Sequence, residues 1–173
     1  MTDDQTDVCS IRSTTNPDDG TAACHMRWGT VQALLSPQAV LATARDLTAA
    51  AAFAETDIAL LSVLRGELHL DDATAGHLLL DVRARRPMPP TPGALRVHAV
   101  AGANTRLPYV HISRGSMKGQ LSPDEAREMA LHWTEAAVAA QIDVRLRYAL
   151  GEWDHVAPDD INRLFTLLQK VQR

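Results

Sequence analysis

The sequence lacks the features that mark several whole classes of protein. Among 173 residues it has only two cysteines, Cys9 and Cys24, too few for a disulfide framework or for a zinc site of four thiolates. No apolar run approaches the roughly 20 residues that span a bilayer, and residues 1–7 are acidic, unlike a signal peptide. We therefore expect a cytoplasmic protein in a reduced compartment, without a membrane partner and without a metal or other cofactor.

Aromatic residues and lysine are scarce as well. Aromatic residues make up 4% of the chain, and the positive charge comes from 15 arginines and only two lysines. The net charge of −4 is too mild to require a nucleic-acid partner or to resemble a DNA mimic. Hydrophobic residues make up 46% and charged residues 22%, which is enough apolar material to bury a core. The composition therefore predicts a folded domain and leaves its partner open.

Motifs of catalysis are also missing. There is no His-Glu-x-x-His, no phosphate-binding loop in the required order, and no Gly-x-Ser-x-Gly. The carboxylate pairs at 71–72, 124–125 and 159–160 stand at predicted helix starts, where capping explains them. Cys9 and Cys24 with a distant histidine could still form a site, but buried thiols are the better interpretation. We predict that the chain is not an enzyme.

The chain does have an internal repeat. An offset of 86 residues matches Leu-Ser-Pro at 35–37 with Leu-Ser-Pro at 121–123, and Gly29 with Gly115. With a two-residue insertion the match continues through the acidic pairs at 71–72 and 159–160 to the end of both halves. Leu-Ser-Pro blocks, glycines and acidic pairs in the same order predict a tandem duplication.

A proline-rich stretch separates the two copies. Residues 87–93 contain four prolines, which block both helix and central strand and predict a stiff linker. The first repeat is then residues 1–86 and the second residues 94–173. Residues 1–86 carry 7 basic and 12 acidic residues, a net −5, whereas residues 87–173 carry 10 and 9, a net +1. The surfaces of the two repeats therefore differ in charge and need not have the same function.

Each repeat reads as a β-hairpin, a long helix and a short helix. Apolar and polar residues alternate around the turn regions 16–20 and 102–106, as in half-buried strands. Ser36-Pro37 and Ser122-Pro123 are typical helix starts, and an apolar stripe rich in alanine follows each of them. Shorter helices begin near Asp71 and Pro158.

These elements predict an α+β fold with one antiparallel sheet of up to four strands. The helices are expected on one face of the sheet, and the two repeats around a pseudo-twofold axis. Small alanines let helices approach closely, so the long helices could pack against each other or against a second copy. A monomeric pseudo-dimer and a homodimer both fit, and the repeats could share one core or form two.

One segment resembles a known group of proteins. The second hairpin runs into Leu-Ser-Pro-Asp-Glu-Ala-Arg-Glu-Met-Ala at 121–130. A strand pair followed by this helix start is similar to a segment common in small, mostly uncharacterised actinobacterial and actinophage proteins. The first copy, residues 35–40, lacks the acidic pair. The resemblance implies a bacterial or phage origin and carries no catalytic residues.

The hairpins carry the candidate binding residues. Basic and aromatic side chains on an outward sheet face can grip phosphates or a protein partner, and His98 and His111 are expected to lie opposite one another. The predicted interaction surface comprises Arg12, His25, Arg27, Arg96, His98, Tyr109, His111 and Arg114. A second candidate is a loop before a helix start, where backbone N–H groups and a lysine could hold an anion or form a plain turn. That loop comprises Gly115, Ser116, Lys118 and Gly119.

Three functions remain open at this point. The preferred one is a non-enzymatic protein-interaction or regulatory module that presents a duplicated surface to a protein partner. The second is a nucleic-acid-binding regulator that uses the arginine-bearing hairpins, for which no helix-turn-helix signature is visible. The third is an enzyme with an unfamiliar site at the repeat junction. Salt-dependent binding would single out the second, and an enclosed polar pocket would favour the third.

Overall fold

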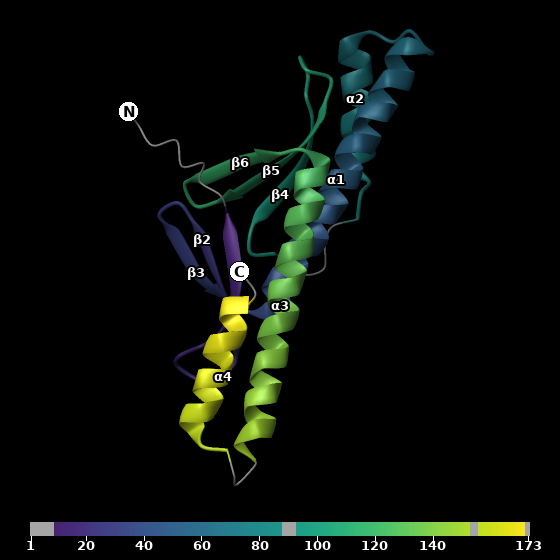
Figure 1. Ribbon diagram of the computed structural model, residues 1–173. Helices are drawn as coiled ribbons and strands as arrows, with labels where there is room; N and C mark the ends of the chain where they lie inside the picture. Colours follow the sequence, from purple (N-terminus) through teal and green to yellow (C-terminus); the bar gives the residue numbers. More distant parts are fainter. Residues whose placement is uncertain (1–8, 88–92, 153–155, 172–173) are drawn as a thin grey trace.

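The computed structural model describes residues 9–87, 93–152 and 156–171. The fold is α+β, with six strands and four helices in these ranges (Figure 1). Most of the predicted linker, residues 88–92, and the acidic residues 1–7 lie outside the described residues. The elements are β1 (Ser10–Thr15), β2 (Ala22–Trp28), β3 (Val31–Leu35), α1 (Pro37–Gly66), α2 (Asp72–Ala84), β4 (Arg96–Ala101), β5 (Pro108–Arg114), β6 (Met117–Leu121), α3 (Pro123–Gly151) and α4 (Pro158–Val171).

The strands form two sheets, so the prediction of a single sheet of up to four strands is wrong. One sheet has the order β1-β2-β3 and the other β4-β5-β6, and all pairs are antiparallel. Each sheet has a third strand because Gly29 (φ +55°) and Gly115 (φ +57°) begin two-residue turns that fold the chain back. Within the hairpins, His98 lies opposite His111, as predicted, and Arg12 opposite His25.

The predicted helix starts are confirmed, because capping is a local interaction. The Ser36 hydroxyl accepts a hydrogen bond from the backbone N–H of Ala39 (3.2 Å), and Asp71 caps α2 through the N–H of Thr74 (2.9 Å). Ser122 caps α3 in the same way, and proline follows the cap in both long helices. Each cap satisfies one of the backbone donors that a helix leaves unpaired at its first turn.

The alanine-rich faces of α1 and α3 are covered by other parts of the same chain. The two helices pack along each other, and each also covers the sheet of the other half: α1 packs on β4 and β5, and α3 on β1 and β2. Buried residues from both halves therefore belong to a single apolar cluster. Its fully buried members include Cys24, Met26, Val40, Leu47, Ala51, Val110, Ala126, Ala137 and Ala140.

The short helices lie at opposite ends of the long pair (Figure 1). Helix α2 packs on the C-terminal part of α1 through a small cluster that includes Leu61, Leu64 and Leu79, and α4 packs on α3. By length and composition alone, α1 could also cross a membrane, a property that it shares with the core helices of soluble proteins. Its many alanines make α1 apolar over a long stretch, although the sequence contains no unbroken run of large hydrophobic residues.

Candidate binding groove between the sheets

A groove of about 810 Å³ lies between the two sheets and the first turns of α3. Its volume falls in the range of pockets that hold ligands. The lining is largely apolar, and carboxylates, a lysine, a glutamine and a histidine stand among the lining residues. These residues are Cys9, Ser10, Ile11, Trp28, Ile112, Met117, Lys118, Gly119, Gln120, Leu121, Glu125, Glu128, Met129, His132 and Trp133.

The groove runs along the edges of two strands. Residues 9–11 and 117–121 line it without a gap. Because side chains alternate between the faces of a strand, consecutive residues line one groove only where the strand edge faces it. In the described residues β1 pairs with β2 alone and β6 with β5 alone, so both strands have an open edge. Open edges present backbone N–H and C=O groups that can pair with another strand.

Two tryptophans form part of the groove wall. Trp133 on α3 is only 1% exposed, and its indole Nε1–H has no hydrogen-bond partner in the described part of the chain. A buried donor without an acceptor is rare, because it has lost its hydrogen bonds to water. Trp28 lies nearby: a Cβ added at Gly119 would stand 3.2 Å from its ring, so the two sheets meet closely at Gly119. A residue of the groove wall thus carries a buried donor that has no acceptor in the described part of the chain.

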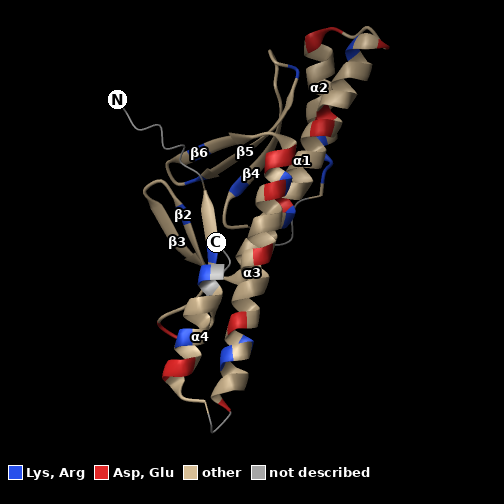
Figure 2. Cartoon of the chain, viewed as in Figure 1, with Lys and Arg blue, Asp and Glu red and all other residues tan. Residues whose placement is uncertain are grey.

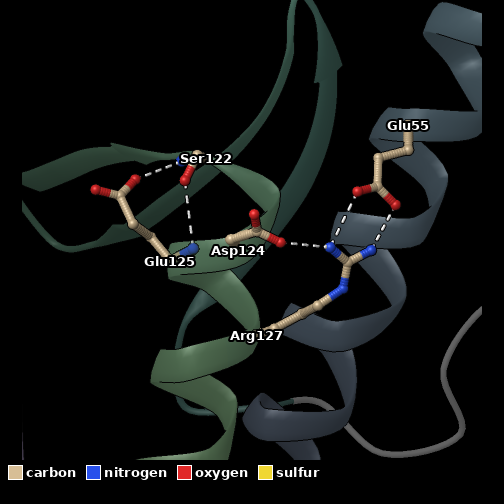
Figure 3. Close-up of polar contacts among 5 residues, drawn as sticks. All are labelled: Glu55, Ser122, Asp124, Glu125 and Arg127. Carbon is tan, nitrogen blue, oxygen red and sulfur yellow. Dashed lines mark hydrogen bonds and ion pairs between the residues drawn. The ribbon is translucent and has the colours of Figure 1, made fainter.

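The first turns of α3 form a fixed wall (Figure 3). The Glu125 carboxylate accepts from the N–H of Ser122 (2.7 Å), and the Ser122 hydroxyl accepts from the N–H of Glu125 (3.3 Å). Arg127 bridges Asp124 of the same helix (3.1 Å) and Glu55 of α1 (3.0 Å). The bonds from Ser122 lower the pKa of Glu125, and the bond from Arg127 lowers that of Glu55. Both carboxylates therefore stay charged well below neutral pH.

The thiols are poor nucleophiles. Burial raises the pKa of Cys9, which lines the groove, to about 11, although the nearby Arg114 opposes the shift. Burial also raises the pKa of Cys24 to about 11. The thiolate is the reactive form, so both side chains are neutral near pH 7. Among the described residues, no group of three or more His, Cys, Asp or Glu side chains could hold a metal ion.

This gives a prediction for cysteine labelling. A rise in the pKa of Cys9 from 9.0 to about 11 lowers its thiolate fraction about a hundredfold and raises its intrinsic nucleophilicity by less. We expect the folded protein to react with iodoacetamide at pH 7.5 at least about tenfold more slowly than the same chain in urea. Mass spectrometry of the digested protein locates each label. Equal rates at Cys9 in the folded and unfolded chain would contradict this environment.

The structure separates the predicted interaction surface into three places. Arg12, His25 and Arg27 share the outer face of the first sheet. On the second sheet, Arg96, His98, Tyr109 and His111 share the outer face, and His111 Nε2 lies 3.0 Å from Gln120 Oε1. Arg114 does not belong to this set. It follows Ile112 on the inner face and donates a hydrogen bond to the carbonyl of Ala94.

Charge is segregated between sheets and helices. The six described strands contain Arg12, Arg27, Arg96, Arg114 and Lys118 but no aspartate or glutamate. Most of the acidic residues lie on the helices instead, as Figure 2 shows. The mild net charge of the whole chain therefore conceals two sheets whose side chains are neutral or basic.

The predicted anion loop is placed away from a helix start. Gly115 and Ser116 form the turn between β5 and β6, and Lys118 and Gly119 lie within β6. The strand β6 thus separates the turn from the N-terminus of α3, so its N–H groups do not extend the helix end. Lys118 and Gly119 line the groove, although no residue of the predicted interaction surface does.

The groove was not predicted because it joins distant parts of the chain. Cys9 and Met117 come close only in the folded structure. The one local signal was the glycine at 115, which could have suggested a turn into a third strand and hence an open edge at β6. Comparison with known proteins adds no assignment: no family model, no curated protein and no solved structure matches this chain.

Proposed function

We propose that this chain is a non-enzymatic protein-interaction module that takes up an extended segment of a partner protein in the groove between the sheets. The observation that carries the proposal is that two open strand edges, β1 and β6, run along one largely apolar groove. An extended segment can add to such an edge as a further strand, with main-chain hydrogen bonds giving affinity and side-chain pockets giving specificity. A regulatory role in the cytoplasm of a bacterium or a phage-infected cell belongs to the same proposal.

The groove lining supports this kind of ligand. Met117 and Met129 are flexible side chains that adapt to different partners, and tryptophans are common at the centres of interfaces. A backbone carbonyl of the bound segment would provide an acceptor for the Trp133 indole N–H, which has none in the described part of the chain. The neutral Cys9 thiol is suited to packing rather than to attack on a substrate.

A tandem duplication is also proposed, as the origin of the two halves. The offset of 86 residues supports it, and so does the strand-strand-strand-helix-helix order that occurs twice. The halves differ at the groove: Arg114 stands where the first half has Trp28, and Gly119 where it has Ala33. These differences account for the fact that β6 and α3 of the second half line the groove, whereas the matching strand and helix of the first half do not.

The first test uses a short capped peptide of alternating valine and threonine as the probe. In a W153F variant the two remaining tryptophans, Trp28 and Trp133, both line the groove, so their fluorescence reports on its occupation. The control is the same peptide with alternate backbone nitrogens methylated, which keeps the side chains but removes donors for strand pairing. We expect saturable binding of the first peptide and at least about tenfold weaker binding of the second. Equal affinities would reject strand addition.

The second test concerns the Trp133 donor. Trp133→Phe removes the indole N–H, and calorimetry should show about tenfold weaker binding of the same peptide, since one buried hydrogen bond is lost. Trp28→Phe is the matched control, because it shortens a ring in the same groove without removing the unpartnered donor. Urea unfolding checks that both variants fold. A loss of affinity no larger for W133F than for W28F would show that the donor plays no part.

A second candidate function is nucleic-acid binding on the outer sheet faces. The absence of carboxylates from the six described strands favours it, since phosphate contacts need basic surfaces. We expect R12E and R96E to abolish binding to a duplex DNA probe and to leave peptide binding in the groove unchanged. Affinity that does not fall as salt rises would exclude this function, because phosphate contacts release counterions.

A further inference from the structure

The outer face of α3 exposes three large apolar side chains, although the alanine face of the helix is already buried. Leu131, Val138 and Ile142 are 57%, 45% and 54% exposed, which is high for side chains of this kind. They lie on the side of the helix opposite to the buried residues Ala130, Ala137 and Ala140. The surface is thus separate from the contact with α1.

These residues belong to a longer pattern with alternating steps of three and four. We call it the outer seam of α3, defined as Glu128, Leu131, Glu135, Val138, Ile142, Arg145 and Ala149. Positions with this spacing are those through which one helix packs along another in a coiled coil, and here apolar side chains occupy Leu131, Val138, Ile142 and Ala149, whereas the other three positions are charged.

The seam also contains a hollow of the right kind. Glu135, Val138, Ala139 and Ile142 line a shallow depression of about 360 Å³, together with Thr134 and Asp143. Four residues at positions i, i+3, i+4 and i+7 form the hole that receives a side chain of the facing helix in coiled-coil packing. The surface therefore fits another helix rather than a small molecule.

Charges along the seam indicate which helix this is. The seam is acidic in its first half, at Glu128 and Glu135, and basic in its second half, at Arg145. Neither Glu128 nor Arg145 forms an ion pair within the described ranges. An antiparallel copy of the same seam places the acidic half against the basic half, whereas a parallel copy would place like charges together.

We propose that two copies of this chain associate through their outer seams, with the α3 helices antiparallel. In this register Glu128 faces the partner's Arg145, Leu131 faces the partner's Ile142, and Glu135 faces the partner's Val138. A twofold axis repeats each contact, so one surface supplies both sides of the interface. Glu128 also lines the groove, so the partner's Arg145 would stand at its rim and neutralise one of its acidic side chains.

The test is the mass of the full chain in solution across a range of concentrations, measured by sedimentation equilibrium. We expect a concentration-dependent dimer. E128R and R145E should each raise the dimer dissociation constant about tenfold or more, because each puts like charges together twice. The double variant E128R/R145E restores opposite charges in every pair and should return to within about threefold of the natural chain.

Two further sets of variants make the result decisive. D81R and R163E change the same charges on exposed positions of α2 and α4, and should leave the dimer unaffected. E135L replaces a charge in the seam by an apolar side chain and should tighten the dimer about tenfold. A chain that stays monomeric at every concentration, or a double variant as weak as its single parents, overturns the proposal. The dimer is measured without any peptide, and peptide binding in the groove is measured separately, so a failure here would leave the proposed function standing.

Discussion

Asp57→Asn is expected to lower the free energy of unfolding by about 3 kcal/mol or more. The Asp57 carboxylate is fully buried on α1 and lies between two arginines of the α2 segment. Arg83 donates from Nε at 2.9 Å, and Arg86 donates from Nη1 at 3.3 Å and also from Nη2. The Arg86 guanidinium lies over the Phe53 ring, 4.3 Å from its centre. Asparagine keeps the volume but removes the charge that holds both guanidinium groups.

The cost is expected to be large because the Arg83 and Arg86 side chains are partly buried, so water cannot replace the lost carboxylate charge around them. With a neutral side chain at 57, two partly buried cations face each other without a counter-charge, and breaking a buried pair from one side commonly costs several kcal/mol. Urea unfolding followed by circular dichroism measures the loss, and an unchanged denaturant slope would show that the unfolded state is not altered. Hydrogen exchange should show the loss of protection first in α2, which these contacts hold on α1.

The chain supplies its own control at the matching position of the second half. Asp143 on α3 is only partly buried, and desolvation raises its pKa despite the nearby Arg147. The negative charge of Asp143 therefore contributes little to the stability of the fold. We expect Asp143→Asn to change stability by no more than about 0.5 kcal/mol. If D143N lowers the free energy of unfolding as much as D57N does, the loss reflects removal of a carboxylate from a helix in general and not the two arginines at Asp57.

The contrast between these aspartates shows what sequence comparison within the chain can predict. The offset of 86 residues also matches Asp57 with Asp143. The partners of Asp57 come from the α2 segment, and the second half has no arginine pair at the matching place. The capped helix starts were predictable because Ser36, Asp71 and Ser122 bond to backbone groups three residues away. Local contacts are therefore shared between the two halves more readily than distant contacts are.

The sheets show where local patterns stop being informative. The alternation of apolar and polar residues identified which face of each hairpin is buried, and it would also have placed Arg114 inward, two residues after Ile112. It could not show which strands are neighbours, and strand β6, with Lys118 and Gly119, is held as a strand by pairing with β5 rather than by its own propensity. Each sheet instead packs against the long helix of the other half. The groove forms because each sheet packs on the helix of the other half, so local sequence patterns could not predict it.

Ala51→Leu is expected to lower the free energy of unfolding by about 2 to 3 kcal/mol. Ala51 is fully buried on α1 within the cluster that both halves share. Leucine adds three carbons to a position surrounded by packed side chains, so α1 must move away from its neighbours or the side chains must leave their preferred rotamers. The measurement is urea unfolding, compared with the natural chain at the same temperature.

The next residue provides the matched control. Ala52 is exposed on the same turn of α1, and leucine and alanine have similar helix propensities, so Ala52→Leu should cost less than about 0.5 kcal/mol. The difference between A51L and A52L then isolates packing from any effect on the helix itself. Because the cluster joins both halves, A51L should destabilise α3 and the second sheet along with α1, in a single cooperative transition. Equal effects of A51L and A52L would mean that the alanine face has spare room, and the close approach of the long helices would then not be what holds the two halves together.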